Sequence, residues 1–122
     1  MLNVLLVEDS RLLAERLRES LEALDGVRVV ASVADELAAA EAVAERRVDA
    51  IVLDLQLRKG TGFGLLERLG RERPTVIVFT NYELPEYRRQ ARALGVEHFL
   101  SKSRDYDRLP LLIQDLEKKG AA

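Results

Sequence analysis

The sequence predicts an α/β domain in which five helices flank a doubly wound parallel sheet of five strands. Three observations lead to this fold class. Apolar segments of strand length alternate with helix-like segments along the whole chain. Two of these segments, Ala50 to Leu53 and Thr75 to Thr80, are almost continuously apolar, which is typical of parallel strands covered on both faces. Polar residues follow several strands directly, at the edge where such sheets bind ligands.

The first half of the chain predicts two strand–helix units. A strand over Asn3 to Val7 leads to a helix that Ser10 caps and that the Asp25-Gly26 turn closes. The second strand runs from Val27 to Val33, and Asp35 is predicted to cap an Ala-rich helix that ends near Arg46. The apolar positions of the first helix recur at helical spacing: Leu12, Leu13, Leu17, Leu21 and Leu24.

The second half repeats this pattern. The strand over Ala50 to Leu53 is followed by a glycine-rich loop and a short helix to about Leu69. The strand over Thr75 to Thr80 precedes a helix that begins at Pro85 and stops at Gly95. A last strand is predicted over Val96 to Leu100. The last helix should start at Asp105 or Asp107, because Pro110 fits only within a first turn. The glycines of the loop, Gly60, Gly62 and Gly64, indicate turn geometry and not a phosphate loop, since no Lys-Ser/Thr pair follows them.

Composition narrows the classes of function. The chain has 122 residues, 48% of them hydrophobic and 33% charged, which indicates one globular domain over residues 1–122. A formal charge of -2 argues against general binding to nucleic acid or to membrane surfaces. The sequence contains no Cys, which excludes disulfides and thiolate metal sites. No apolar run reaches the length of a membrane span and no signal segment is recognised, so we expect a cytoplasmic protein.

The predicted strand ends bring three carboxylates, a hydroxyl and an ammonium to one edge of the sheet. Glu8 and Asp9 follow the first strand, Asp54 the third, Thr80 ends the fourth, and Lys102 lies just past the fifth. Carboxylates about 4 Å apart repel by roughly 4 kcal/mol at an effective dielectric of 20, so the cluster either raises a pKa or recruits a cation. Oxygen ligands with few carboxylates favour Mg²⁺. A carboxylate is also a nucleophile toward phosphorus, and phosphoryl transfer depends mainly on positioning and charge neutralisation.

These motifs resemble the receiver domains of response regulators in bacterial two-component systems. The resemblance rests on Glu8-Asp9, Leu53-Asp54-Leu55 with Gly62 eight residues on, Phe79-Thr80 and Phe99-Leu100-Ser101-Lys102, in the same order and at the same spacing over essentially the whole chain. It implies a flavodoxin-like fold with strand order 2-1-3-4-5 and a stand-alone, single-domain signalling switch.

The resemblance also implies a role for each matching residue. Asp54 matches the phosphoacceptor, Asp9 a direct Mg²⁺ ligand, Glu8 a water-mediated ligand, and Gln56 a ligand through its backbone carbonyl. Three further residues match the switch: Thr80 as the hydroxyl that moves to the phosphoryl group, Lys102 as the cation that pairs with it, and Phe99 as an aromatic that changes rotamer.

The chain departs from the family pattern at three positions. Arg58 and Ser103 stand where receivers commonly carry Pro, and Asn81 stands where a small residue usually follows the switch Thr. Because a cis bond without proline costs roughly 2.5–4 kcal/mol, we expect a trans bond between Lys102 and Ser103. The only histidine, His98, has no evident catalytic partner in the sequence and indicates a surface or partner-facing position.

The resemblance implies a phosphodonor, either a histidine kinase or a phosphotransfer protein, and an output through a downstream protein or a homodimer. The responding surface would be formed by the helix from Pro85, the last strand and the last helix, and the chain would catalyse only its own phosphorylation and dephosphorylation. Two alternatives remain open. One is a receiver-like binding module that no longer uses phosphorylation. The other is a phosphatase with an Asp nucleophile. Gln56 argues against this alternative, because it occupies the position where such enzymes carry their general acid.

Overall fold

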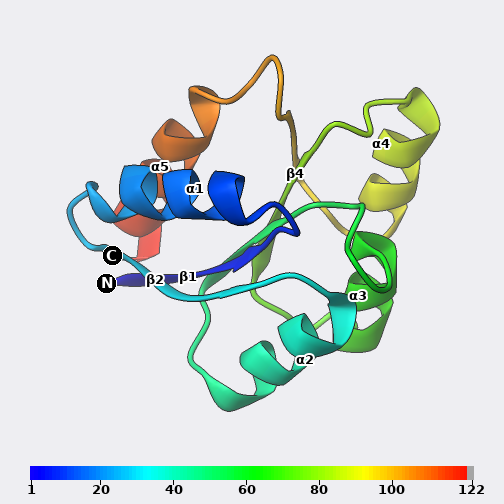
Figure 1. The fold of residues 1–122 in the computed structure, drawn as a ribbon, viewed down its shortest axis with the longest axis horizontal. Helices are drawn as coiled ribbons and strands as arrows, with labels where there is room; N and C mark the ends of the chain where they lie inside the picture. Colours follow the sequence, from blue (N-terminus) through cyan, green and yellow to red (C-terminus); the bar gives the residue numbers. More distant parts are fainter. Residues whose placement is uncertain (121–122) are drawn as a thin grey trace.

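The computed structural model describes residues 1–120 and has a flavodoxin-like fold (Figure 1). Within these residues, five parallel strands form one sheet in the order β2-β1-β3-β4-β5, as the sequence predicted. The strands are β1 (Leu2–Val7), β2 (Val27–Val33), β3 (Ala50–Leu53), β4 (Thr75–Thr80) and β5 (His98–Ser101). The strand order reverses at β1 and β3, which is the position where doubly wound sheets bind their ligands.

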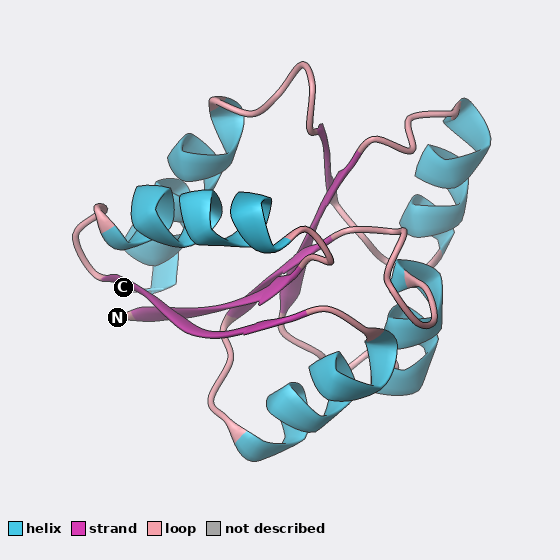
Figure 2. Ribbon diagram, viewed as in Figure 1, coloured by secondary structure: helices cyan, strands magenta, loops and turns pink. Residues whose placement is uncertain are grey.

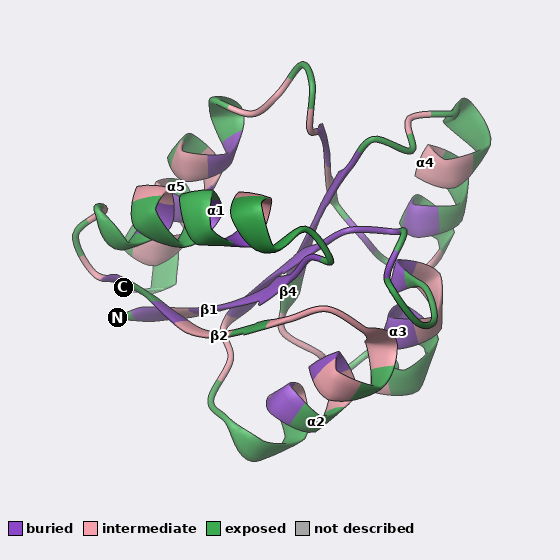
Figure 3. Cartoon of the chain, in the orientation of Figure 1, coloured by how far each residue is buried: buried purple, intermediate pink, exposed green. Residues whose placement is uncertain are grey.

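Two layers of helices cover the sheet (Figure 2). Helices α1 (Arg11–Glu22) and α5 (Arg108–Gly120) pack on one face, where their apolar side chains join a core that includes Val4, Ile77 and Phe79. Helices α2 (Glu36–Glu45), α3 (Gly62–Leu69) and α4 (Pro85–Ala93) pack on the other face, around a core that includes Leu5, Ile51 and Val78. The three central strands β1, β3 and β4 are therefore almost wholly buried, the edge strand β2 is only partly covered, and the outer helix surfaces are exposed (Figure 3).

Most predicted caps and boundaries are confirmed. The Ser10 hydroxyl accepts from the backbone N–H of Leu13, and the Asp35 carboxylate accepts from that of Ala38. Strand β1 begins one residue earlier than predicted, because Leu2 pairs with Val27. Helix α1 ends at Glu22, before the Asp25-Gly26 turn that was expected to close it. Leu12 was expected on the apolar face of α1 but is 60% exposed.

Near the carboxyl terminus one predicted boundary is wrong, and the start of the last helix is confirmed for the second of its two candidates, Asp107. The last strand spans His98–Ser101 and not Val96 to Leu100, because the backbone N–H of Val96 donates to the carbonyl of Ala91 and closes the end of α4. Gly95, at φ +90°, makes this reversal possible, since a side chain would strain that conformation. The last helix begins at Arg108, directly after Asp107, whereas the carboxylate of Asp105 accepts from the backbone N–H of Ser101 at 2.8 Å.

Strand register decides which residues meet at the carboxyl edge. Val7 pairs with Leu53, so the residues that follow these two strands come side by side at the centre of the sheet. Thr80 pairs with Ser101, which brings the loop after β5 next to the end of β4. In the part of the chain that the structure describes, no helix is long and apolar enough to cross a bilayer.

Candidate functional site

Three carboxylates meet at the carboxyl edge of the sheet. Oxygens of Glu8, Asp9 and Asp54 lie within 4.8 Å of one another. The sheet holds two of them through the backbone: the N–H of Glu8 donates to Val33 O at 2.9 Å, and the N–H of Asp54 donates to Val7 O at 3.0 Å. Glu8 and Asp54 are buried and Asp9 is exposed, so the cluster opens toward solvent on one side only. The predicted convergence of these residues is therefore confirmed.

Asp54 is the centre of the site, since both of its carboxylate oxygens are hydrogen-bonded. Its Oδ1 accepts from the Thr80 hydroxyl at 2.7 Å and from the backbone N–H of Gln56 at 3.2 Å. Its Oδ2 accepts from the ammonium of Lys102 at 2.7 Å. Thr80 is fully buried, and its Oγ1 also accepts from the backbone N–H of Tyr82 at 3.2 Å. The hydroxyl thus links the carboxylate to the loop after β4.

Lys102 bridges two of the carboxylates. Its Nζ lies 2.6 Å from Glu8 Oε1 and 2.7 Å from Asp54 Oδ2, although Ser103 and not proline follows it. Burial alone would lower the pKa of Lys102, but the hydrogen bonds and charges of Asp54 and Glu8 outweigh it and raise that pKa. Burial raises the pKa of Glu8, against the opposing effects of Lys102 and of the Ser10 N–H. The site therefore resists carrying three negative charges without a cation.

Two predicted site residues lie at the edge of this cluster. Gln56 is exposed and contacts Asp54 through its N–H; its carbonyl as a metal ligand stays a prediction. Phe99 pairs with Val78, so it lies on the same face of the sheet as Thr80 but farther from the edge. The guanidinium of Arg88 lies 4.5 Å from the centroid of its ring. Phe99 as a moving switch also stays a prediction.

The loop between β3 and α3 folds tightly around Asp54. The backbone N–H of Gly62 donates to Leu55 O at 3.0 Å, and a Cβ at Gly62 would come within 2.6 Å of the Asp54 carbonyl oxygen. Glu36, at the start of α2, accepts from the backbone N–H of Thr61 at 3.1 Å and pairs with Arg68. The glycines thus serve the geometry of the turn, as the sequence indicated, and α2 anchors the loop.

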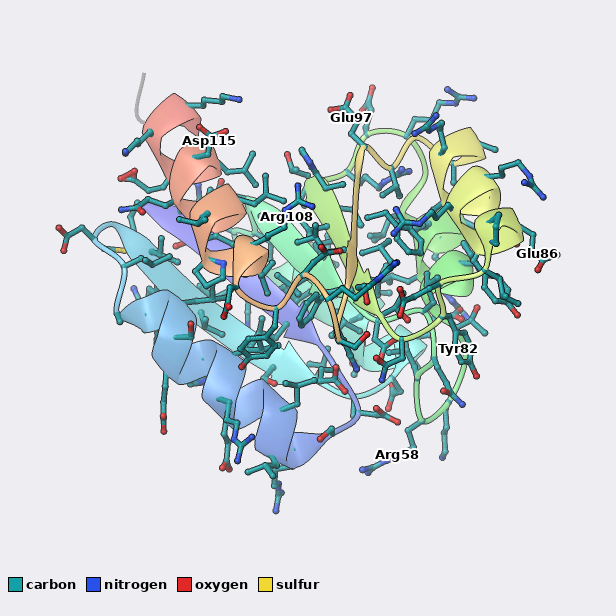
Figure 4. All side chains as sticks on the ribbon, turned by 90° about the horizontal axis from the view of Figure 1, so that it is seen from above. Arg58, Tyr82, Glu86, Glu97, Arg108 and Asp115 are labelled. Carbon is teal, nitrogen blue, oxygen red and sulfur yellow. The ribbon has the colours of Figure 1, made fainter. Side chains whose placement is uncertain are left out.

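The three departures from the family pattern fall at the rim of the site. Arg58 and Asn81 are exposed, and Figure 4 shows Arg58 pointing outward. The bond between Lys102 and Ser103 is trans, as expected. The hydroxyl of Ser103 contacts the hydroxyl of Ser101 at 3.1 Å and donates to Glu83 Oε2 at 3.3 Å.

Sequence reasoning missed this last contact network altogether. The polar run from Ser101 to Asp105 follows β5 directly and could have indicated a structured loop. Glu83 carried no such signal, because its partner Ser103 lies 20 residues away.

The arrangement suits a hard cation and phosphoryl chemistry. The donor set consists of carboxylate oxygens, which is the set that Mg²⁺ prefers, and the exposed position of Asp9 leaves that side open to water. A buried carboxylate that already faces a hydroxyl and an ammonium has the neighbours that a transferred phosphoryl group requires for its oxygens.

Comparison with known proteins decides the family. The response regulator receiver domain family matches residues 4–114. The chain belongs to this family. The receiver is 38% identical over 103 residues to protein-glutamate methylesterase/protein-glutamine glutaminase 1 of Xanthomonas campestris, covering 81% of this chain and 28% of that protein. A relative with the same enzyme name from Shewanella sp. strain MR-4 is 34% identical over 104 residues, covering 83% of this chain and 30% of that protein. The receiver therefore spans less than a third of the length of these relatives.

Solved structures agree with this fold. The non-phosphorylated HemR receiver domain of Leptospira biflexa superposes with a TM-score of 0.84 at 28% identity, covering 96% of this chain and 94% of that one. The response regulator domain of Thermotoga maritima CheB gives a TM-score of 0.84 at 21% identity, covering 97% of this chain and 95% of that one. Phosphorylation-dependent switching is the general function of the family to which this chain belongs.

Proposed function

We propose that this receiver is a phosphorylation-controlled signalling switch in which Asp54 accepts the phosphoryl group. One observation carries the proposal: Glu8, Asp9, Thr80 and Lys102 all converge on Asp54 at the edge of the sheet where the strand order reverses. The phosphodonor would be a histidine kinase or a phosphotransfer protein. The chain's own chemistry would then be limited to gaining and losing its phosphoryl group.

In the proposed reaction, a carboxylate oxygen of Asp54 forms a bond to phosphorus while the bond from phosphorus to the donor's imidazole nitrogen breaks. The electron pair of that bond stays on the imidazole. Asp54, Asp9, the Gln56 carbonyl and, through water, Glu8 would hold Mg²⁺. The bound ion would neutralise charge on the phosphoryl oxygens. Lys102 already lies 2.7 Å from Asp54 and would pair with another of these oxygens.

Thr80 would convert the chemical change into movement. In the unmodified chain its hydroxyl donates to Asp54 Oδ1 at 2.7 Å. A phosphoryl group adds roughly -1.5 to -2 charges at neutral pH, so the hydroxyl would exchange its carboxylate partner for a phosphoryl oxygen. The Tyr82 N–H, which donates to the same hydroxyl, ties the following loop to this exchange. We propose that Phe99, below α4, follows by changing its rotamer.

The responding surface would be formed by α4, β5 and α5. Three arginines lie along one side of α4, at positions 88, 89 and 92, and the guanidinium of Arg88 reaches the ring of Phe99 in β5. A groove between β5 and α5 is lined by Phe99, Leu112 and the 68% exposed Leu111, with Glu97, Arg108 and Asp115 around it (Figure 4). A mixed apolar and charged surface of this kind fits a protein partner, either a downstream target or a second copy of the receiver.

The test is the intact mass after incubation with acetyl phosphate and Mg²⁺. We expect the gain of one phosphoryl group, which EDTA abolishes and which Asp54→Asn removes. Asp49→Asn is the matched control, because Asp49 precedes β3 at the opposite edge of the sheet whereas Asp54 follows it. Label that persists on Asp54→Asn would show that the acceptor is misassigned. A wild-type chain that binds neither Mg²⁺ nor phosphoryl groups would instead indicate a receiver that only binds partners.

A further inference from the structure

We propose that Glu83 is a positioning residue that ties the loop after Thr80 to the loop after Lys102, and thereby keeps both side chains directed at Asp54. The inference rests on the proposed function of Asp54 and deepens it. It concerns a residue that touches neither the phosphoacceptor nor the carboxylate cluster, and its support is a chain of contacts between two segments that are distant in sequence.

Glu83 uses both of its carboxylate oxygens to reach the second loop. Its Oε1 lies 2.5 Å from Nη2 of Arg104, and its Oε2 accepts from the hydroxyl of Ser103 at 3.3 Å. The side chain is 27% exposed, so it lies against the protein instead of extending into solvent. The hydroxyl of Ser101, the guanidinium of Arg104 and the hydroxyl of Ser103 hold the pKa of Glu83 below its usual range. The carboxylate is therefore ionised and bound at neutral pH.

The second loop is itself closed by hydrogen bonds around Lys102. Ser101 is fully buried, and its hydroxyl contacts that of Ser103 at 3.1 Å and accepts from the Arg104 N–H at 3.2 Å. Its backbone N–H donates to Asp105 Oδ2 at 2.8 Å, and its carbonyl accepts from the Asp105 N–H at 2.8 Å. Residues 101–107 include no proline, so side-chain contacts and not a rigid ring fix the backbone that carries Lys102.

The first loop is connected to the site through Thr80. The Tyr82 N–H donates to the Thr80 hydroxyl, and the Lys102 N–H donates to the Thr80 carbonyl at 3.0 Å. Glu83 follows Tyr82 directly and adds a side-chain connection beyond this backbone bond. When the Thr80 hydroxyl changes its partner, a displacement of the first loop would therefore pull on Ser103 and Arg104. Without Glu83, the two loops would be linked only through the backbone at Thr80 and Lys102, and their responses to phosphorylation would be less closely coupled.

The experiment compares Glu83→Ala and Glu83→Gln with Glu86→Gln, a control that removes an exposed carboxylate three residues later. Amide hydrogen exchange of the metal-free protein reports the position of the second loop at Lys102, Arg104 and Asp105. The rate constant for phosphorylation by acetyl phosphate with Mg²⁺ reports the catalytic consequence. Amides of β3 serve as the reference for global stability, since a merely structural role would accelerate their exchange to the same extent.

For Glu83→Ala we expect about tenfold faster exchange at Lys102, Arg104 and Asp105, with β3 unchanged. We also expect a rate constant about tenfold lower, because a displacement of about 1 Å in a catalytic group can cost up to ~100-fold. Glu83→Gln should show a smaller effect, since its carbonyl still accepts from Ser103, and Glu86→Gln should show none. Exchange in Glu83→Ala that matches the wild type, or that rises equally in β3, would overturn the proposal. If the wild type accepts no phosphoryl group, the proposed function fails, while the exchange measurement still decides the role of Glu83.

Discussion

Replacing Lys102 by Met should destabilise the metal-free protein far more than it destabilises the Mg²⁺-bound form. The ammonium lies 2.6 Å from Glu8 and 2.7 Å from Asp54, with 13% of the Lys102 side chain exposed. At an effective dielectric of 20, each contact amounts to about 6 kcal/mol of Coulomb attraction before desolvation is counted. Desolvation offsets much of this attraction, but removing one partner of a buried pair still costs roughly 3–5 kcal/mol, because the remaining charges are left uncompensated.

We expect a loss of about 3 kcal/mol in the free energy of unfolding at pH 7, at the lower end of that range. The loss lies at the lower end because burial raises the pKa of Glu8, so that Glu8 can take up a proton and relieve part of its repulsion with Asp54. The raised pKa of Lys102 means that its contribution is fully present below its unfolded pKa, near 10.5, and is lost as pH rises through the folded value. Between pH 7 and pH 9 the contribution of Lys102 itself should therefore stay constant, and the gap between wild type and variant should grow only as Glu8 of the variant loses its proton.

Urea unfolding followed by circular dichroism, with and without saturating Mg²⁺, measures this difference. Lys119→Met is the matched control: Lys119 pairs with Asp115 at 3.1 Å, but 73% of its side chain is exposed, so its loss should cost less than about 1 kcal/mol. Mg²⁺ held by the carboxylates, as proposed, would supply the missing positive charge, so we expect it to narrow the gap for Lys102→Met by at least about 1 kcal/mol. Equal stabilities of the two variants without Mg²⁺, or a gap that Mg²⁺ leaves unchanged, would refute the electrostatic reasoning.

Three further substitutions test the parts of the site separately. Thr80→Ala removes a buried hydroxyl that donates to Asp54 at 2.7 Å and should lower the free energy of unfolding in urea by about 2 kcal/mol. Thr80→Ser keeps the hydroxyl and should lose much less, so equal losses would assign the effect to the methyl group. Gly62→Ala places a Cβ 2.6 Å from the Asp54 carbonyl oxygen and should lower the free energy of unfolding by about 2–3 kcal/mol. Gly120→Ala, where nothing lies within 4 Å, should change it very little. A Gly62→Ala variant as stable as the wild type would show that the loop adapts to the added methyl group. Glu36→Gln should cost about 0.5 kcal/mol at pH 7. Because Arg68 and the Thr61 N–H lower the pKa of Glu36, this difference should persist above its unfolded pKa of about 4.5 and disappear as pH falls through the folded value; a difference independent of pH would exclude the carboxylate as its cause.

The sequence by itself determined the fold class and the main members of the site. Continuous apolar runs such as Ala50–Leu53 indicate strands that are covered on both faces, and the residues that follow such strands must lie at one edge of a parallel sheet. Periodicity places Asp54, Glu8 and Asp9 at the same edge, while the strand order that sets β3 beside β1 was implied by the resemblance to receiver domains. The caps Ser10 and Asp35 were equally evident, since a cap acts within a few residues of its own position.

Only the tertiary structure decided how the ends of the elements close and how the loops are joined. Val96 looked like strand, yet its N–H completes the turn that ends α4, and Leu12 looked like core although α1 turns it toward solvent. The contacts of Lys102 with Glu8, of Glu36 with Thr61 and of Glu83 with Ser103 join residues that no local pattern connects. Periodicity reports which face of an element is buried, but the hydrogen bonds of a loop depend on where the whole chain brings its partners.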